Sequence, residues 1–313
     1  MDLVTGGLGF IGNELVRQLR PFGPVAILDN RNRVAPRIED IARVPVYDVD
    51  VTDAPGVRRV LETLRPRRVF HLAAIHYIPE CNANPERTIR VNVEGTLAVL
   101  NACVASGVER VVFASSGAIY ADSATPIPET SPVAPVDVYG WSKAFGEDLC
   151  RWIAASGRLP IVAARLFNNF GPRETNRHII PEIVDQLRAG NTLRLGNVSS
   201  IRDYVHTADT ARALIALADM PMDGFSCVNV ATGNGASVEE LVSMLAAKLG
   251  RPLEIELDAS RVRAVDKNVQ VADISRIRSS TSWRPAVSLE SGLGDLLEFE
   301  GIAVAEPECA RDA

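Results

Sequence analysis

Two short segments of the chain carry side chains that could do chemistry. The first is Tyr-Gly-Trp-Ser-Lys, in which Tyr139 and Lys143 stand four positions apart. On a helix, this spacing places both side chains on one face, one turn apart. A tyrosine with its ordinary pKa of about 10 is a poor base at neutral pH, but a neighbouring ammonium favours the phenolate. The pair therefore predicts proton transfer by Tyr139, with electrostatic support from Lys143.

The second segment is the glycine-rich run Thr-Gly-Gly-Leu-Gly-Phe-Ile-Gly, which ends at Gly12. An apolar run precedes it and a helical pattern follows, so it predicts a strand, a tight turn and a helix. Such a turn can hold a dinucleotide pyrophosphate at the amino end of the helix. Gly6 would permit the turn, Gly9 would let the backbone approach the pyrophosphate, and Gly12 would let the helix pack on the sheet. Phe10 and Ile11 are predicted contacts in the same turn.

A carboxylate stands about 20 residues beyond these glycines, where a ribose contact is expected. The apolar run Val25-Ala-Ile-Leu ends at Asp29, which could accept hydrogen bonds from both ribose hydroxyls. A 2′-phosphate would be repelled there, so the sequence favours NAD over NADP, although Arg31 and Arg33 could weaken that preference. Further predicted cofactor contacts are Asn30 and the small or apolar residues after a later strand, Leu72, Ala73 and Ala74.

The elements that must position these residues alternate up to about Arg165. Such alternation predicts an α/β fold with a Rossmann-type, doubly wound parallel sheet, whose ligands bind at the carboxyl ends of the strands. After Leu166 the pattern becomes irregular and indicates a smaller mixed α/β substrate domain. The expected division is 1–167 with a return segment at about 203–231, then 168–202 with 232–300, then a tail at 301–313. The predicted strands are Val44–Val49, Val69–Ala74, Arg110–Ser115 and Ile161–Leu166, and the predicted helices are Pro55–Leu64, Thr88–Ser106 and Val138–Ala155.

Composition excludes several classes of protein. The 313 residues are 47% hydrophobic and 23% charged, which is ordinary for a globular chain. A net charge of −6 argues against nucleic acid as the main partner, and the longest apolar runs are too short to span a membrane. The five cysteines and four histidines lack metal-ligand spacing. We therefore expect a reduced cytoplasmic protein without a metal site, with His71 as a core residue.

Together these motifs resemble the extended short-chain dehydrogenase/reductase family, in its NAD-dependent nucleotide-sugar epimerase/dehydratase branch. The resemblance runs from about Leu3 to Leu297. It implies that Ser116 is a catalytic hydroxyl that hydrogen-bonds the reacting sugar hydroxyl, and that Tyr139 and Lys143 contact the cofactor. The further cofactor-side residues that it implies are Asp50 and Val51 after the third strand, Ser115, and Asn92 in the helix motif Asn-Val-Glu-Gly-Thr.

The resemblance also implies a substrate side. Arg202 and Arg263 match arginines that clamp a substrate diphosphate, a role that suits guanidinium groups, although structural salt bridges are the alternative. UDP is the expected nucleotide, while Gly-Asn-Val-Ser-Ser-Ile from Gly196 is more typical of some GDP-sugar enzymes. The remaining predicted substrate contacts are Asn168, His178, Ile179 and Asp266.

The reaction is predicted from what is missing near Ser116. The 4,6-dehydratase subgroup carries an Asp-Glu pair where this chain has Gly117 and Ala118, so elimination of water is not expected. A 4-epimerase needs only one base, a tightly held NAD and room for a 4-keto sugar to turn over. A nucleotide-sugar decarboxylase, a ketoreductase and a non-catalytic NAD-binding sensor remain alternatives.

The same branch implies a homodimer joined through two helices of each subunit. Both predicted helices carry apolar residues beyond one core-facing stripe. Some of the candidates for this interface must face the sheet instead, and the alternative is that all six are ordinary core residues: Val99, Ala102, Cys103, Phe145, Leu149 and Trp152.

Overall fold

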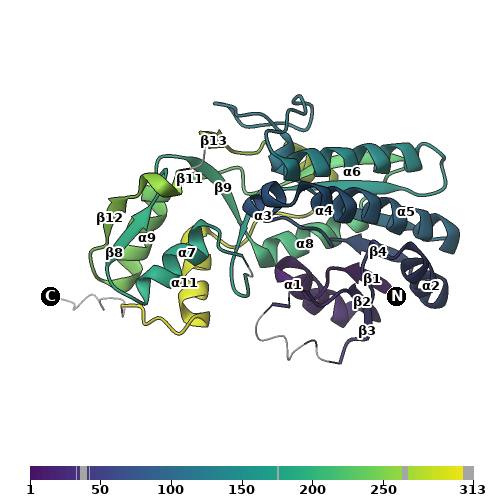
Figure 1. The fold of residues 1–313 in the computed structure, drawn as a ribbon, viewed down its shortest axis with the longest axis horizontal. Helices are drawn as coiled ribbons and strands as arrows, with labels where there is room; N and C mark the ends of the chain where they lie inside the picture. Colours follow the sequence, from purple (N-terminus) through teal and green to yellow (C-terminus); the bar gives the residue numbers. More distant parts are fainter. Residues whose placement is uncertain (33, 36–40, 42, 175, 263–266, 306–313) are drawn as a thin grey trace.

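The computed structural model describes residues 1–32, 34–35, 41, 43–174, 176–262 and 267–305. Two lobes are visible in Figure 1, a larger one around a sheet and a smaller one at the opposite end of the long axis. Strand β9 (Ile201–His206) runs between the two lobes.

The large lobe contains a seven-stranded sheet, in which every pair of neighbouring strands is parallel. The strand order is β10-β6-β5-β4-β1-β2-β3, which confirms the predicted Rossmann-type fold. Because all strands run the same way, their carboxyl ends meet at one edge of the sheet. The strands are β1 (Asp2–Thr5), β2 (Val25–Asp29), β3 (Val46–Asp48), β4 (Arg68–His71), β5 (Arg110–Ser116), β6 (Ile161–Leu166) and β10 (Phe225–Val230).

Successive strand residues alternate between two hydrophobic layers. Val4 and Val112 face one layer with helices α1 (Phe10–Leu19) and α8 (Thr207–Ala218). Their neighbours Leu3 and Val111 face the opposite layer, which α2 (Ala54–Leu64), α5 (Gly95–Ser106) and α6 (Val138–Ala154) cover. Since both faces of the inner strands are buried, their middle positions are mostly apolar, which is typical of parallel sheets.

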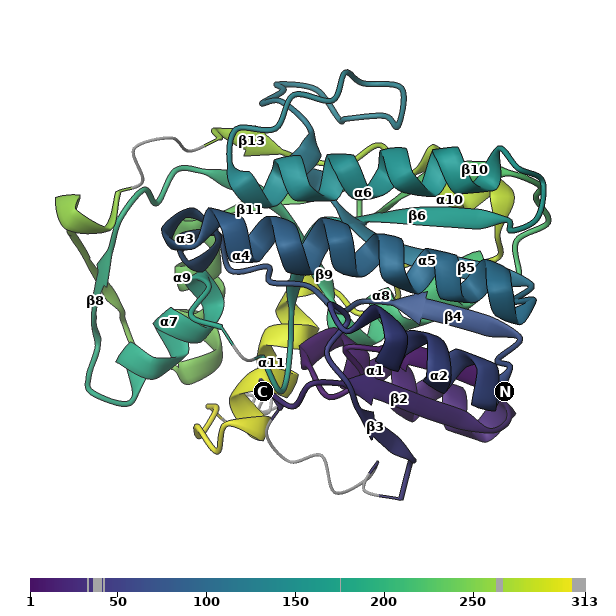
Figure 2. The ribbon, with the colours of Figure 1, turned by 45° about the vertical axis from the view of Figure 1, so that its right-hand side comes forward.

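Helices α5 and α6 lie side by side over the sheet (Figure 2). Before α5, the chain forms α3 (Ile78–Ala83), α4 (Pro85–Ile89) and one π-helical turn, η3 (Arg90–Glu94). π-Helical turns are rare and occur often at functional sites. This one contains Asn92, which the sequence placed in the supporting helix.

The small lobe contains three helices, α7 (Ile179–Leu187), α9 (Val238–Leu249) and α11 (Leu289–Phe299), which share one hydrophobic cluster. Its strands are β7 (Asn168–Phe170), β8 (Thr192–Leu195), β11 (Gly235–Ser237), β12 (Glu254–Leu257) and β13 (Val269–Gln270). Beyond β13, α10 (Ser275–Ser280) returns to the large lobe, where Ile277 and Trp283 join the layer of α1 and α8. This segment therefore packs apart from the small lobe, in which the predicted division had placed it.

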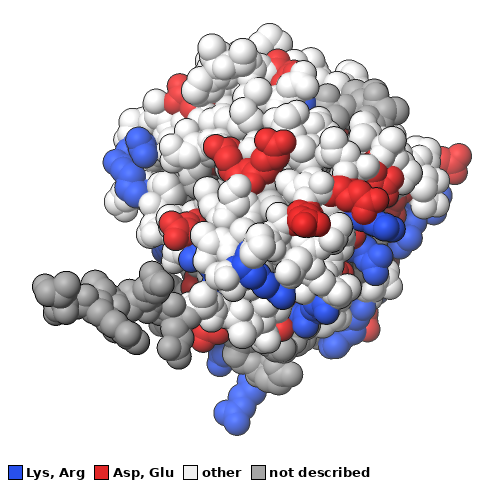
Figure 3. Space-filling model, turned by 90° about the vertical axis from the view of Figure 1, so that its left-hand side faces the viewer, with Lys and Arg blue, Asp and Glu red and all other residues white. Residues whose placement is uncertain are grey.

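The surface of the small lobe carries charges of both signs. Figure 3 shows acidic and basic side chains interspersed on the outer face of the small lobe. Among the residues that the structure describes, no helix is long and apolar enough to cross a membrane.

Candidate active site

One cavity of about 1170 Å³ lies at the carboxyl edge of the large sheet and extends to the small lobe. Its size exceeds that of most single-ligand pockets, so it has room for a dinucleotide and a second ligand. The predicted residues on its wall are Gly6, Gly9, Phe10, Ile11, Gly12, Asp29, Asn30, Val51, Leu72, Ala73, Ala74, Ser115, Ser116, Tyr139, Lys143, Asn168, His178, Ile179 and Arg202. The fold thus brings together residues from 197 positions of sequence, from Gly6 to Arg202.

The glycine turn is shaped by close backbone contacts. Gly6 has a φ of +72°, and a Cβ there would lie 2.8 Å from the backbone nitrogen of Ala73. A Cβ on Gly12 would lie 2.1 Å from the carbonyl oxygen of Gly6. Gly9 differs, because its nearest neighbour would be that same carbonyl at 3.4 Å. The open face at Gly9, before a helix with no side-chain cap, fits the approach of a pyrophosphate.

Asp29 lies at the end of β2 and faces this turn. Its carboxylate accepts hydrogen bonds from the backbone N–H groups of Leu8, at 3.1 Å, and Arg31, at 2.8 Å. Burial is the largest influence on this carboxyl and raises its pKa, against the effect of those donors. Asp29 is thus fixed beside the glycines, where it could receive ribose hydroxyls.

Asp50 differs from its predicted role, because it lies off the cavity wall. Its carboxylate accepts from the Asn30 amide at 2.7 Å and from the backbone and hydroxyl of Thr52. Burial opposes its ionisation, but these donors outweigh burial and lower its pKa. Asp50 therefore orients Asn30, which is on the wall, while Val51 supplies the apolar contact beside it.

The side chains of Ser116 and Tyr139 lie close together on the cavity wall. Ser116 ends β5, and its Oγ also accepts from the backbone N–H of Ala118 at 3.1 Å. Burial raises the pKa of Tyr139 to about 12, and the neighbouring Ser116 hydroxyl opposes that shift only in part. Tyr139 therefore holds its proton more tightly than a free tyrosine, and the expected preference for the phenolate would depend on Lys143 together with the positive nicotinamide ring of a bound cofactor.

Lys143 lies one turn after Tyr139 on α6, as predicted. Its Nζ donates to the carbonyl oxygen of Ala114 at 2.7 Å and lies 5.8 Å from the centre of the Tyr139 ring. Burial lowers the pKa of Lys143 to about 8. The ammonium is thus held by the end of β5, close to the two reacting hydroxyls.

Asn92 supports this arrangement from behind the wall. Its side chain accepts from the N–H of Ile75 and donates to the carbonyl of the same residue, both at 2.8 Å. It also donates to Ser142 Oγ at 2.9 Å, and Ser142 donates to the carbonyl of Tyr139. The predicted cofactor role of Asn92 is therefore replaced by one of bracing α6, because these partners occupy its amide.

Ser115 also departs from its predicted role. Its hydroxyl points away from the cavity and donates to Glu147 at 2.5 Å. Glu147 receives two bonds from Arg165, at 2.9 and 2.7 Å, and both side chains are almost completely buried. Only the backbone of Ser115 is left for a cofactor, and Glu147 ties α6 to β5 through Ser115 and to β6 through Arg165.

The substrate side places Arg202, Asn168 and His178 on the cavity wall. Arg202 Nη1 donates to the carbonyl of Ile201 at 2.9 Å, and Arg202 is one of the residues that line the cavity. His178 precedes α7 and pairs with Glu174. Arg263 and Asp266 lie outside the described residues.

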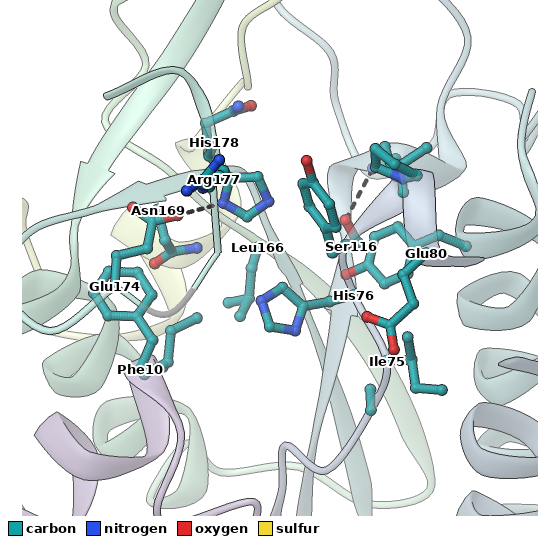
Figure 4. Close-up of a pocket in the computed structure, with 18 of the residues that line it drawn as sticks. Phe10, Ile75, His76, Glu80, Ser116, Leu166, Asn169, Glu174, Arg177 and His178 are labelled. Atoms are coloured by element: carbon teal, nitrogen blue, oxygen red, sulfur yellow. Dashed lines mark hydrogen bonds and ion pairs between the residues drawn. The ribbon is translucent and has the colours of Figure 1, made fainter. Parts of the chain in front are cut away.

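Several cavity residues were missed by the sequence analysis. His76 bonds to Asn176 across the mouth of the cavity, with 2.6 Å between Nε2 and Nδ2. In Figure 4, Ser116 and Glu80 lie on one side, Glu174, Arg177 and His178 lie opposite, and His76 stands between them. Two further missed residues, Lys267 and Gln270, contact the turn that follows Ser116. Lys267 could have been noticed in the sequence, because lysine is rare in this chain: it supplies three of the 33 basic residues.

Known proteins resemble this chain along most of its length. The model of the NAD dependent epimerase/dehydratase family matches residues 3–231. A UDP-glucose 4-epimerase of Azospirillum brasilense is 32% identical over 305 residues, which cover 90% of this chain and 86% of that protein. A GDP-6-deoxy-D-mannose reductase of Pseudomonas aeruginosa is 29% identical over 306 residues, covering 94% and 95% of the two chains. The crystal structure of Thermus thermophilus UDP-glucose 4-epimerase complexed with NAD has a TM-score of 0.86 at 32% identity, covering 96% of this chain and 99% of that chain.

Proposed function

Because the chain belongs to the NAD dependent epimerase/dehydratase family, we propose that it is a nucleotide-sugar 4-epimerase that acts on UDP-sugars. The observation that carries the proposal is the neighbouring pair of Ser116 and Tyr139, with Lys143 beside it, on a wall shared with the glycine turn. Relatives named UDP-glucose 4-epimerase support the choice of reaction.

The cofactor is NAD, as in the related solved structures. Gly9 and the amino end of α1 would hold its pyrophosphate, and Asp29 would hold the adenine ribose. When bound, NAD supplies the hydride acceptor and donor, and its oxidised ring adds a positive charge beside the buried phenol. That charge would counter the burial that raises the pKa of Tyr139.

Tyr139 would take the proton from the sugar 4-hydroxyl, and later return it. Ser116 would hydrogen-bond the same oxygen, and Lys143 would stabilise the phenolate. Because neither Gly117 nor Ala118 offers an acid or a base, the 4-keto sugar would keep its 6-hydroxyl. Turning that ketone over in the cavity before reduction would invert carbon 4.

Arg202 would bind the diphosphate through its guanidinium, at the end of the cavity that the small lobe provides. Arg263 and Asp266 complete the proposed substrate side, with Asn168, His178 and Ile179. Substituting Arg202 by Ala should raise the KM for the nucleotide sugar and leave NAD content unchanged.

The test incubates the purified protein with UDP-, dTDP-, GDP- and CDP-sugars and resolves the products by chromatography and NMR. We expect a C4 epimer of a UDP-sugar, formed by protein that already contains NAD(H), since an epimerase regenerates its cofactor in each turnover. Reduction of a nucleotide-linked 4-keto sugar, dependent on added NADH or NADPH, would instead indicate a ketoreductase, since one relative is named as a reductase. Release of carbon dioxide from a UDP-uronic acid would indicate a decarboxylase.

The exposed face of α6 supports the further proposal of a homodimer. Trp141, Phe145 and Trp152 are 48%, 44% and 65% exposed, which is unusual for side chains of this size. Leu149 is partly buried against the core behind them. The other three candidates, Val99, Ala102 and Cys103, are buried in a hydrophobic core of the single chain, which is the alternative expected for some of the six. A light-scattering mass near 33.8 kDa, that of one chain, would contradict the dimer.

A further inference from the structure

The turn that follows the catalytic serine is held from the small lobe by a lysine. This turn, η4 (Gly117–Ile119), directly follows Ser116. Lys267 Nζ donates to the carbonyl oxygen of Ala118 at 3.0 Å and to that of Tyr120. One ammonium therefore fixes the carbonyls on both sides of Ile119, about 150 positions away in the sequence.

A second side chain from the same segment completes the contact. Gln270 Nε2 donates to the carbonyl of Gly117 at 3.1 Å. Lys267 and Gln270 are only 9% and 8% exposed, and both line the cavity. Strand β13 lies near the loop after η4 in Figure 2, and Asp122 in that loop accepts from the backbone of Asn268 and Val269.

The same segment also contacts the proposed diphosphate site. Strand β13 pairs with β9, with Val269 opposite Ile201 and Gln270 opposite Arg202. Arg202 Nη1 also approaches the carbonyl of Asn268, at 3.4 Å. Residues 267–270 therefore touch Arg202 on one side and the serine turn on the other.

A buried ammonium is a costly way to hold a turn. Burial lowers the pKa of Lys267 to about 8, because the charged form loses its water. A structural hydrogen bond alone could be made by a neutral side chain at lower cost. The charge and the two carbonyl acceptors thus indicate a contact with a use beyond stability.

We propose that Lys267 and Gln270 are positioning residues, which couple occupancy of the diphosphate site at Arg202 to the geometry of the turn that presents Ser116. The inference rests on the proposed nucleotide-sugar substrate. The coupling would use the binding energy of the nucleotide, which does not itself react. That energy would orient the serine hydroxyl at the reacting carbon. Lys267 and Gln270 themselves need not touch the sugar.

Hydrogen–deuterium exchange with UDP tests the coupling without turnover. In the wild-type protein, we expect UDP to slow exchange both in a peptide covering β9 and in one covering residues 114–121. In Lys267→Met, the β9 peptide should still be protected and the 114–121 peptide should not. The matched control is Lys248→Met, since Lys248 lies on α9 and pairs with Glu290 on the far side of the small lobe. This control should behave like the wild type.

Kinetics with a full and a truncated substrate give the second readout. Lys267→Met should lower kcat on the UDP-sugar about tenfold with little change in KM, which is the signature of an interaction used in the transition state. It should lower kcat on the corresponding sugar 1-phosphate much less, because that substrate has no nucleotide with which to drive the coupling. Lys267→Arg should restore most of the rate, since it keeps a cationic donor.

The outcomes separate this inference from the proposed function. Equal losses of kcat on both substrates, or a protected 114–121 peptide in Lys267→Met, would overturn the coupling and leave the epimerase intact. If UDP protects no peptide of the wild-type protein and no nucleotide sugar is turned over, the proposed function fails and the coupling fails with it. Should Lys267→Met not fold, Gln270→Leu takes its place, with the same expected pattern.

Discussion

The two ends of the cavity are built in different ways. At the cofactor end, backbone meets backbone, and a Cβ on Gly6 or Gly12 would collide with main-chain atoms at 2.8 or 2.1 Å. At the substrate end, long side chains make the contacts, as in the pair His76–Asn176, which joins distant segments, and the pair Arg261–Glu182 within the small lobe. The first end is fixed by local sterics, whereas the second depends on contacts between distant segments.

This difference shows which part of the cavity can vary between proteins with different substrates. A glycine turn admits few substitutions, because its geometry leaves no room for side chains. Side chains that cross between lobes can change one at a time without disturbing the sheet. We therefore expect the cofactor end to be common to relatives with different substrates, and the substrate end to determine which sugar is accepted.

The largest expected effect is on kcat, and it follows from changing Tyr139, which lies between the cofactor end and the substrate end of the cavity. Tyr139→Phe removes the proton-transferring oxygen and should lower kcat by about 100- to 10,000-fold, the usual contribution of a general acid–base group. NAD content and UDP affinity should not change, because each end remains intact. Tyr47→Phe is the matched control, since Tyr47 lies on edge strand β3, away from the cavity wall. Full activity in Tyr139→Phe would contradict the mechanism.

The next prediction concerns the buried ion pair between Arg165 on β6 and Glu147 on α6, the helix that carries Tyr139 and Lys143. Arg165→Met leaves the buried carboxylate of Glu147 without its partner, which should cost about 3–5 kcal/mol of unfolding free energy. Arg151 pairs with Asp148 on the same helix, but both are exposed, so Arg151→Ala should cost about 0.2–1 kcal/mol. Urea denaturation at pH 7 measures both. Equal costs would show that the buried pair is not what holds α6 to β6.

A smaller effect should appear in the pH dependence of stability. Lys143 has a pKa of about 8 in the folded protein and 10.5 as its ordinary value, so the unfolded chain binds more protons between these values. Wild-type stability should therefore rise from pH 8 to about pH 10.5 through this group. Lys143→Met removes that rise and should be more stable than the wild type at pH 7 by up to about 3 kcal/mol, at 1.36 kcal/mol per pKa unit. Denaturation midpoints that show no gain at pH 7 would contradict the assignment.

Sequence alone predicted the local parts of this molecule well. The strand from Ile161 to Leu166 has the predicted bounds, and α6 ends within one residue of them. Periodicity and the Tyr-Lys spacing are sufficient for such elements, because neighbouring residues determine them. The glycine turn also lies where its spacing predicted, at the start of α1.

The misses share one physical cause, which is that a sequence does not say where a side chain points. Ser115 and Ser116 are adjacent, yet one hydroxyl faces Glu147 and the other faces Tyr139. Val99 and Cys103 are as apolar as Trp152, but only the tryptophan is left at the surface. Lys267 gains its role from β13, a strand of two residues in an irregular segment. Tertiary packing decides each of these cases.

Gly9 offers the most direct test of the difference between the two ends. A Cβ at Gly9 would meet only the Gly6 carbonyl, at 3.4 Å, so Gly9→Ala should fold normally. The added methyl would occupy the space through which the pyrophosphate approaches the backbone, so NAD affinity should fall about tenfold, or ~1.4 kcal/mol. Gly190→Ala is the control, because a Cβ there meets nothing within 4 Å. Calorimetric titration with NAD, together with UDP affinity and thermal unfolding, measures the outcome. If Gly9→Ala weakened UDP as much as NAD, the two ends would share their binding surface, and the distinction between a backbone-built and a side-chain-built end would be wrong.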